Sequence, residues 1–243
     1  MHDASGQLEL QRLAEAYAQA AAQASGWLSA SELARLARLR VPARREQYLA
    51  GHWLARVLLA ERFGGHPRTW QLQEREGLPP AVIDAPDACF ISLSHSGAWL
   101  ACAIASEAIG IDVEARPRLH SLASVEKLLL GTNEAPGSVD SDGLLLRWVA
   151  KEALIKQRCA SALPERLQQL QLHPLDGAAC DVRVYSAPNY HLAVAARCEP
   201  AMRGLSEHTE SRAWRVHDLA VSWSENAQSE PALALILQPQ TAQ

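Results

Sequence analysis

The chain has 243 residues, of which 48% are apolar, and its formal net charge is −4. This length accommodates one large domain or two domains of ordinary size, with enough apolar residues for a sizeable core. The negative charge argues against a general nucleic-acid-binding protein, and the absence of an apolar run of about 18 residues argues against a membrane span.

The first half of the chain has the pattern of three helices followed by three strands. Residues 8–24 are rich in Ala and Gln, which favour a helix. Ser29 and Glu32 have the spacing of a capping box and open a second helix. Pro42 suits the first turn of a third helix, which a pair of glycines ends. Strands are predicted over 69–76, 88–96 and 98–106, and the last two are expected to form a hairpin.

The second half of the chain repeats the order of helix, strand and hairpin. A helix is predicted over 143–160, and strands are predicted over 168–173, 180–186 and 190–197. The residues themselves do not match between the halves, so the repeat is one of pattern only. We therefore predict two similar α+β lobes with a cleft between them, over 1–108 and 109–225, followed by a loosely ordered tail over 226–243.

The beginning of the chain and its cysteines indicate a cytoplasmic protein. The sequence MHDASGQLELQRL lacks the basic and then apolar pattern of a signal peptide. The five cysteines include no CxxC pair, so they indicate neither a zinc site nor a disulfide framework. We expect them to be small core residues in a reducing compartment. They are Cys89, Cys102, Cys159, Cys180 and Cys198.

Two acids lie close together at the junction of the predicted lobes, in the sequence GIDVE. Alternate residues of a strand face the same side, so Asp112 and Glu114 point together while Ile111 and Val113 point into a core. The repulsion between two like charges has to be offset, and a bound cation is the obvious candidate.

The helix over 143–160 carries a third acid and a lysine on one face. Trp148, Glu152 and Lys156 have the spacing i, i+4 and i+8. Taken alone, Glu152 and Lys156 form an ordinary surface ion pair that contributes about 0.2–0.5 kcal/mol. Together with the two acids of the strand, however, Glu152 completes a set of oxygen ligands of the kind that Mg²⁺ prefers. Lys156 could then hold a phosphate charge.

The basic residues are mostly arginines, and only three of the 23 are lysines. Five arginines lie within eleven residues, which indicates either a solvated helix face or a site for phosphates or an acidic partner. They are Arg35, Arg38, Arg40, Arg44 and Arg45. Two of the lysines, Lys151 and Lys156, share one short helical segment, where a compact ammonium group is favoured over the planar guanidinium group of arginine.

A strand end with the sequence SLSHSG offers several hydrogen-bond donors. Neighbouring strand residues face opposite sides, which argues against Ser94 and His95 as a catalytic pair. A single histidine is more often structural than functional. Two serines and a histidine that run into a turn nevertheless suit an anion such as phosphate.

Three motifs in this order resemble the Sfp-type 4'-phosphopantetheinyl transferase family. They are Ser94-His95-Ser96, then IGIDVE over 109–114, and then WVAKEALIK over 148–156. Each motif is weak alone, but all three in the right order and at roughly the right spacing are specific. The resemblance covers about residues 30–200. It implies that family's α+β fold, in which two pseudo-twofold-related lobes, each a helix packed on a small and mainly antiparallel sheet, bind coenzyme A between them.

The resemblance also implies a reaction. The 4'-phosphopantetheine arm of coenzyme A would move to a serine of an acyl or peptidyl carrier protein, and adenosine 3',5'-bisphosphate would be released. Asp112, Glu114 and Glu152 would hold Mg²⁺ against the pyrophosphate, and Glu152 would also be the base for the carrier serine. The protein is expected to be a monomer with no nucleic-acid or membrane partner.

The remaining residues of the motifs would bind coenzyme A. Lys156, helped by Lys151, would stabilise charge on the leaving phosphate. The nucleotide's 3'-phosphate would contact Ser94 and His95. The family's basic segment that reaches coenzyme A phosphates corresponds to the region of Arg44 and Arg45.

The chain departs from the family at one place. The family's GKP motif, whose lysine contacts coenzyme A, corresponds here to Glu76-Gly77-Leu78-Pro79-Pro80. Leu78 cannot bind phosphate, so either Arg75 substitutes for the lysine, or coenzyme A binds more weakly, or activity is reduced. Because the metal and base positions are intact, an active enzyme is favoured. A non-catalytic homologue that binds coenzyme A or carrier proteins, and a plain α+β domain with three exposed acids, are the alternatives.

Overall fold

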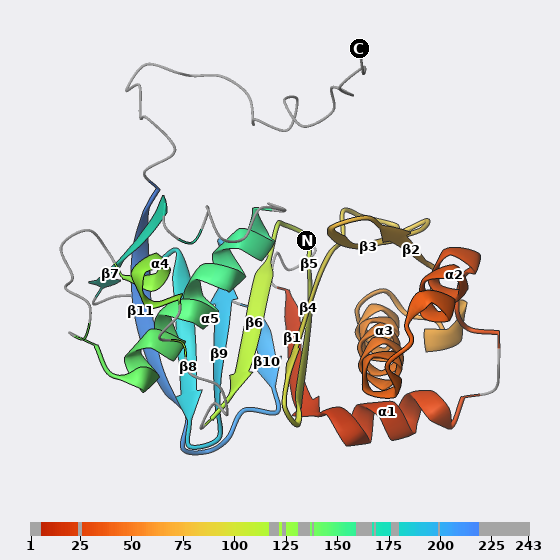
Figure 1. The fold of residues 1–243 in the computed structure, drawn as a ribbon. Helices are drawn as coiled ribbons and strands as arrows, with labels where there is room; N and C mark the ends of the chain where they lie inside the picture. Colours follow the sequence, from red (N-terminus) through yellow and green to blue (C-terminus); the bar gives the residue numbers. More distant parts are fainter. Residues whose placement is uncertain are drawn as a thin grey trace, which may run out of the picture.

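The computed structural model describes residues 6–218, apart from residues 24–25, 117–121, 123–124, 131–136, 138, 159–166, 168, 176–179 and 199. The predicted α+β class is confirmed, because helices pack on two separate, mainly antiparallel sheets. Figure 1 shows the sheets side by side, with β4 and β6 at the seam between them. No helix in these described ranges is long and apolar enough to cross a membrane.

The sheet of the first lobe has the strand order β10-β1-β5-β4. Its strands are β1 (Gln7–Arg12), β4 (Phe90–Ser96), β5 (Trp99–Ala105) and β10 (Ala201–Arg203). The helices of this lobe are α1 (Leu13–Ala21), α2 (Ala30–Arg38) and α3 (Pro42–Phe63), followed by the 3₁₀ turn η1 (Pro67–Thr69). A separate hairpin of β2 (Leu72–Arg75) and β3 (Leu78–Val82) stands beside α2.

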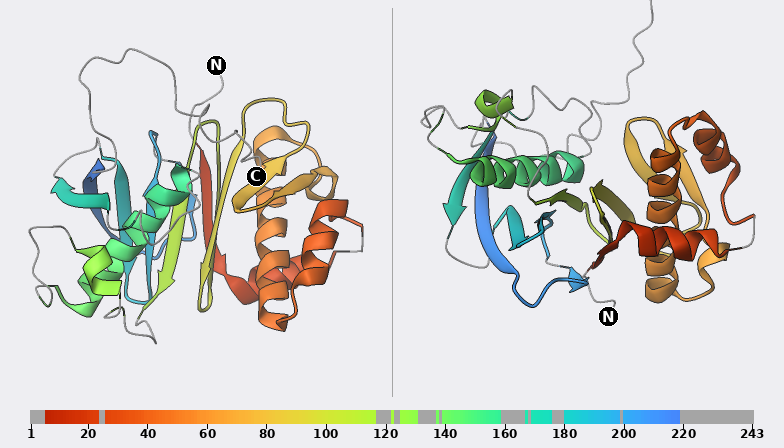
Figure 2. Two further views of the ribbon diagram at one scale, coloured as in Figure 1. Left: turned by 45° about the horizontal axis from the view of Figure 1, so that its top comes forward. Right: turned by 60° about the horizontal axis from the view of Figure 1, so that its bottom comes forward.

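The sheet of the second lobe has the strand order β6-β9-β8-β11-β7. Its strands are β6 (Gly110–Ala115), β7 (Leu170–Leu175), β8 (Val182–Ala187), β9 (Tyr190–Ala195) and β11 (Glu210–Asp218). The helices are α4 (Glu126–Leu129) and α5 (Ser141–Gln157). Both views in Figure 2 show α5 lying across one face of this sheet, where its apolar residues form a core with β8 and β9.

Several local predictions are confirmed. Ser29 caps α2, and the capping box with Glu32 is complete. Pro42 opens α3, and Gly64 ends it with a φ of 82°. The predicted hairpins are β4–β5 and β8–β9, both antiparallel. The expectation that the cysteines are core residues holds for Cys102, which is buried, but it is wrong for Cys198, which is exposed, while Cys89 and Cys180 are half-buried.

The prediction of one helix over 8–24 is wrong in its first part. Residues 7–12 form β1, which pairs with β5 and buries the alternating Leu8 and Leu10 completely or almost completely. Pairing with a strand ninety residues away outweighs the helix preference of this local sequence. The strands β3, β10 and β11 were not predicted.

The division into lobes at residue 108 stays a prediction, and β10 qualifies it. This strand lies in the second half of the chain but pairs in parallel with β1 of the first sheet. The predicted tail over 226–243 lies outside the described residues.

The two sheets meet at a seam built from serine side chains. Ile111 N–H donates to Ser92 Oγ at 3.0 Å, and Val113 N–H donates to Ser94 Oγ at 3.1 Å. The hydroxyls of alternate serines in β4 therefore accept the hydrogen bonds that main-chain carbonyls accept between neighbouring strands. Because Ser92 pairs with Ile111 and Ser94 with Val113, β4 and β6 run in the same direction. The backbone N–H groups of the β6 edge are satisfied without joining the sheets into one.

Helix α5 approaches β6 most closely at Gly110. A Cβ atom at this buried glycine would overlap the backbone of Ala153 and Gln157. Glycine is therefore required here because it lets the helix that carries Glu152 pack against the strand that carries Asp112.

We expect Gly110→Ala to separate α5 from β6 and to lower the free energy of unfolding by at least the roughly 1–3 kcal/mol typical of overpacking. Urea unfolding measures this change. The matched control is Gly51→Ala in α3, where the nearest atom to the added Cβ lies at 3.5 Å and no loss is expected. Equal stability of the two variants would contradict the account of close helix–strand packing.

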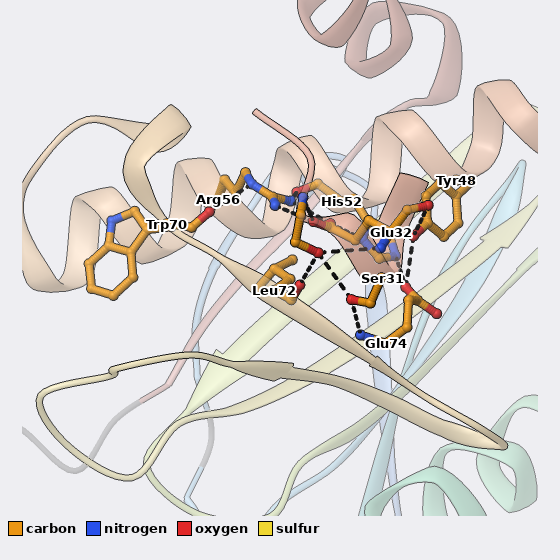
Figure 3. Close-up of polar contacts among 9 residues, drawn as sticks. Ser31, Glu32, Tyr48, His52, Arg56, Trp70, Leu72 and Glu74 are labelled. Carbon is orange, nitrogen blue, oxygen red and sulfur yellow. Dashed lines mark hydrogen bonds and ion pairs between the residues drawn. The ribbon is translucent and has the colours of Figure 1, made fainter. Parts of the chain in front are cut away.

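The first lobe contains a buried polar cluster centred on Glu32, shown in Figure 3. The Glu32 carboxylate accepts from Arg56 Nη1 at 2.8 Å and Nη2 at 2.6 Å, and from His52 Nδ1 at 2.7 Å. Glu32 and Arg56 are both fully buried. Burial alone raises the pKa of Glu32, but the hydrogen bonds from His52 and Arg56 outweigh it and lower this pKa to about 2.

This cluster predicts a specific loss of stability in acid. A depressed carboxyl pKa stabilises the fold above the ordinary pKa of 4.5, and the stabilisation is lost as pH falls toward about 2. The difference corresponds to about 3 kcal/mol. We expect Glu32→Gln to lose this pH dependence, and to lose about 3–5 kcal/mol at neutral pH because Arg56 is left buried without its counter-ion.

Urea unfolding of the native protein and the variant from pH 7 to pH 3 measures both effects. The control is Glu61→Gln, which removes an exposed partner of Arg203 and should change stability by less than about 1 kcal/mol. If Glu32→Gln lost no more stability at neutral pH than Glu61→Gln, the buried pair of Glu32 and Arg56 would not stabilise the fold as proposed.

Candidate functional site

A cleft of about 820 Å³ opens between the hairpin β2–β3, α2, β4 and α5. It brings residues of both lobes together, as the pattern of the sequence predicts. The charged residues that line it are Arg35, Arg38, Glu74, Arg75, Glu76, Glu152 and Lys156. Arginines on one wall thus face the lysine and acid of the α5 motif.

Asp112 and Glu114 face the serines of the seam. Ser94 Oγ donates to Asp112 Oδ1 at 2.7 Å, and Ser96 Oγ donates to Glu114 Oε2 at 2.5 Å. The two acids therefore lie on one face of β6, as the alternation predicted, while Ile111 and Val113 are buried on the other. Asp112 is only 3% exposed.

Lys156 connects the strand acid with the helix acid. Its Nζ donates to Asp112 Oδ1 at 2.7 Å and lies 3.9 Å from Glu152 Oε2. Glu152 and Lys156 are therefore more than a surface ion pair. The Lys156 ammonium group makes its shorter contact with Asp112, a buried acid of β6. The lysine compensates the charge of Asp112 inside the seam.

The acids around Lys156 are candidate ligands for a hard divalent cation. Among the described residues, no three His, Cys, Asp or Glu side chains are already gathered as a metal site. Asp112 Oδ2, however, is buried and has no hydrogen-bond partner in the described structure. Mg²⁺ commonly uses only one or two protein carboxylates and completes its shell with water and substrate phosphate. Asp112 and Glu152 fit that smaller set, with Lys156 between them.

The start of α5 is held by a second polar group. Asp142 accepts from Arg116 Nε at 2.7 Å and from His191 Nε2 at 3.0 Å. Burial raises the pKa of Asp142, but the hydrogen bonds and charges of His191 and Arg116 outweigh it and lower this pKa. These contacts, to the residue that follows β6 and to β9, orient the helix, and hence Glu152 and Lys156, against the strand that carries Asp112.

A second cavity of about 430 Å³ lies next to the cleft, and both are lined by Arg35 and Leu93. It contains the predicted anion ligands Arg44 and His95, whose Nη1 and Nε2 atoms are 3.5 Å apart. Burial lowers the pKa of His95, and the charges of Arg44 and Lys156 lower it further. The lowered pKa favours the uncharged imidazole of His95.

Comparison with known proteins agrees with the motifs. The chain is 29% identical over 167 residues to "4'-phosphopantetheinyl transferase Sfp" of Bacillus subtilis (strain 168), which covers 61% of this chain and 72% of that protein. It is 28% identical over 165 residues, with the same coverage, to "4'-phosphopantetheinyl transferase ffp" of Bacillus subtilis. These similarities support the Sfp-type 4'-phosphopantetheinyl transferase family that the three motifs indicate.

A further protein of Bacillus subtilis named 4'-phosphopantetheinyl transferase is 38% identical over 66 residues, which is 27% of this chain and 29% of that protein. No family model matches the chain.

The hairpin that stands where the phosphopantetheinyl transferase family has its GKP motif lines the cleft. Arg75 Nε donates to the carbonyl of Pro79 at 2.8 Å, which holds the arginine across the turn. Leu78 is 39% exposed and also lines the cleft. Arg75 thus supplies a fixed cation three residues before the leucine.

Three predicted phosphopantetheinyl transferase site residues lie elsewhere. Arg45 Nη1 donates to the Leu36 and Leu39 carbonyls at the end of α2. Lys151 is buried, and its Nζ donates to the carbonyls of Leu128 and Leu167 at 3.2 and 2.7 Å. Ser94 is buried, and its hydroxyl contacts Asp112 and Val113. None of the three lines the cleft or the second cavity, and neither do Asp112 and Glu114, which face the serines of the seam.

Two features of the transferase cleft were missed or left open by sequence reasoning. Arg35 and Arg38 line it, so their interpretation as a site for phosphates stays a prediction that their position permits. Ser92 belongs to the seam, and only the alternation of Ser92, Ser94 and Ser96 along one strand could have indicated it.

Proposed function

We propose that this protein transfers 4'-phosphopantetheine from coenzyme A to a serine of an acyl or peptidyl carrier protein, with Mg²⁺. The observation that carries the proposal is the meeting of Asp112 and Glu152 with Lys156 beside an arginine-lined cleft. The similarity to proteins named 4'-phosphopantetheinyl transferase supports the same reaction.

The transfer needs one proton acceptor and several groups that neutralise phosphate charge. The carrier serine oxygen attacks the phosphorus that bears the pantetheine arm, and the bond from this phosphorus to the pyrophosphate bridging oxygen breaks. Glu152 lines the cleft and accepts the serine proton, directly or through water. Lys156 stabilises the negative charge that develops on the departing adenosine 3',5'-bisphosphate.

Mg²⁺ would be held by Asp112 and Glu152, with Glu114 beside them on β6, and when bound it neutralises charge on the pyrophosphate. Lys156 would then leave Asp112 and turn toward a phosphate. Ser94 and Ser96 keep the two strand acids in place through their hydrogen bonds. For Ser94 this positioning of Asp112 replaces the direct phosphate contact that the resemblance implied.

The phosphates of coenzyme A are proposed to lie along the two adjoining cavities. Arg44 and His95 would bind the 3'-phosphate in the smaller cavity, while Arg35, Arg38 and Arg75 would face the pyrophosphate in the cleft. Arg75 would take over the role of the missing GKP lysine. An arginine in this place offers a planar fork of donors to phosphate.

Carrier proteins are acidic, and the arginine-rich surface of α2 next to the cleft offers charge complementarity to such a partner. We also propose that the protein acts as a monomer in the cytoplasm.

The test is transfer of a fluorescent coenzyme A analogue to several apo carrier domains, with and without EDTA. We expect Mg²⁺-dependent labelling, and loss of at least about 10²-fold in rate for Asp112→Ala and for Glu152→Ala, the range expected for a general base. The matched control is Glu107→Ala, an exposed acid between β5 and β6, which should leave labelling unchanged.

Carrier binding without label transfer from the native protein would indicate the non-catalytic alternative. Labelling that survives both EDTA and Asp112→Ala would remove the acid pair from the mechanism.

A further inference from the structure

The hairpin β2–β3 forms one wall of the cleft, but it belongs to neither of the two larger sheets. It forms a two-stranded sheet apart from the two larger ones. An isolated two-stranded hairpin is marginally stable at best in water. The turn of this hairpin nevertheless supplies a continuous part of the cleft lining, from Glu74 to Pro80. Its position must therefore be fixed by contacts with neighbouring elements.

Four hydrogen bonds connect the segment from Trp70 to Glu74, which includes most of β2, with α2, its N-cap residue and α3 (Figure 3). Arg56 Nε donates to the Trp70 carbonyl at 3.0 Å, and Ser29 Oγ donates to the Leu72 carbonyl at 2.6 Å. The other two contacts both involve Glu74. Its N–H donates to Ser31 Oγ at 3.1 Å, and its Oε1 accepts from Tyr48 Oη at 2.8 Å.

Glu74 lies where the pairing of β2 with β3 becomes irregular. The register shifts between Gln73 and Arg75, so the residue between them is not part of the regular ladder. Glu74 of β2 there stands opposite two residues of β3, Pro79 and Pro80, so the extra residue of this bulge lies on β3. In this hairpin the backbone of Glu74 is bound to α2 and its side chain to α3. The very next residue is Arg75, which lines the cleft.

The anchoring groups are themselves rigid. Tyr48 stacks on His52 with ring centroids 4.0 Å apart, and His52 Nε2 lies 3.4 Å from Glu74 Oε1. His52 in turn contacts the buried Glu32 through its other nitrogen. Ser31 follows the helix cap, and its Oγ is 3.1 Å from that of Ser29. The two tethers of Glu74 therefore lead back to the buried ion pair of Glu32 and Arg56.

We infer that Tyr48 and Ser31 are positioning residues, which hold Glu74 opposite the bulge of β3 and thereby fix the cleft wall that contacts coenzyme A. The inference rests on the proposed function, since it concerns the binding of that substrate. Ser31 also lines the cleft and Tyr48 the second cavity, but their hydroxyls are bound to Glu74. The tethers therefore act through the hairpin and not on the reacting atoms, so they affect the affinity for coenzyme A and leave the transfer step unchanged.

The experiment compares Tyr48→Phe and Ser31→Ala with the native protein. Each change removes one hydroxyl and keeps the rest of the side chain, so the fold and the stacking on His52 are retained. We expect the KM for coenzyme A to rise about 3–10-fold, the effect of one lost hydrogen bond, with kcat within about twofold of the native value. Controls are Tyr17→Phe in α1 and Ser211→Ala in β11, which should change neither constant.

Amide hydrogen exchange of residues 72–82 in the ligand-free variants supplies a readout that does not depend on activity. We expect faster exchange of the hairpin in Tyr48→Phe and in Ser31→Ala, while the amides of β4 and β5 keep their native protection. Both variants must show faster exchange of the hairpin. If the hydroxyl of Tyr48 or Ser31 only contacted the nucleotide, its removal would raise KM without faster exchange of the hairpin.

The outcomes separate this inference from the proposed function. An active native protein whose variants keep native hairpin exchange, or exchange faster with an unchanged KM, overturns the positioning role alone. A fall in kcat at unchanged KM overturns it as well. A native protein that transfers no label overturns the proposed function and, with it, this inference, even where hairpin exchange responds as expected.

Discussion

The arrangement of this protein depends on the hydrogen bonds that cross the seam from β4 to β6. An edge strand normally exposes unpaired N–H groups, which must be satisfied by water, another strand or side chains. In this seam the hydroxyls of Ser92 and Ser94 accept from β6, and those of Ser94 and Ser96 donate to its acids. One strand of short side chains thus joins the sheets and places two carboxylates at their boundary.

The charges at this boundary are arranged around the same seam. Burying Asp112 is costly unless the carboxylate is paired and hydrogen-bonded, and Ser94 and Lys156 supply both to one of its oxygens. The other oxygen has no partner within the described structure. Close packing at Gly110 and the contacts of Asp142 bring α5 to the position where Lys156 can reach the strand. A reaction centre for a polyanionic substrate can therefore form only where both lobes are in place.

The parts of the fold that local sequence patterns control were predictable. The capping box of Ser29 and Glu32, the opening of α3 at Pro42 and the common face of Asp112 and Glu114 each follow from spacing within a few residues. Contacts between distant segments were not. Leu8 and Leu10 join a strand because β5 lies beside them, and no pattern within 8–24 indicates that partner.

The candidate site shows the same division. The helical spacing of Glu152 and Lys156 predicted their common face, but it could not show that the main-chain carbonyls of Leu128 and Leu167 would bind Lys151 on the opposite side. Likewise, the two serines around His95 were interpreted as anion donors, because their acceptors lie eighteen residues further along the chain.

The central claim is that Asp112 and Glu152 share a cation site which Lys156 gives up when substrate binds. Anomalous diffraction from crystals grown with coenzyme A and Mn²⁺ tests it most directly. We predict one metal peak that contacts both carboxylates and a pyrophosphate oxygen, with Lys156 Nζ moved from Asp112 to a phosphate. A metal bound elsewhere, or Lys156 still on Asp112 in the presence of bound coenzyme A, would contradict the account.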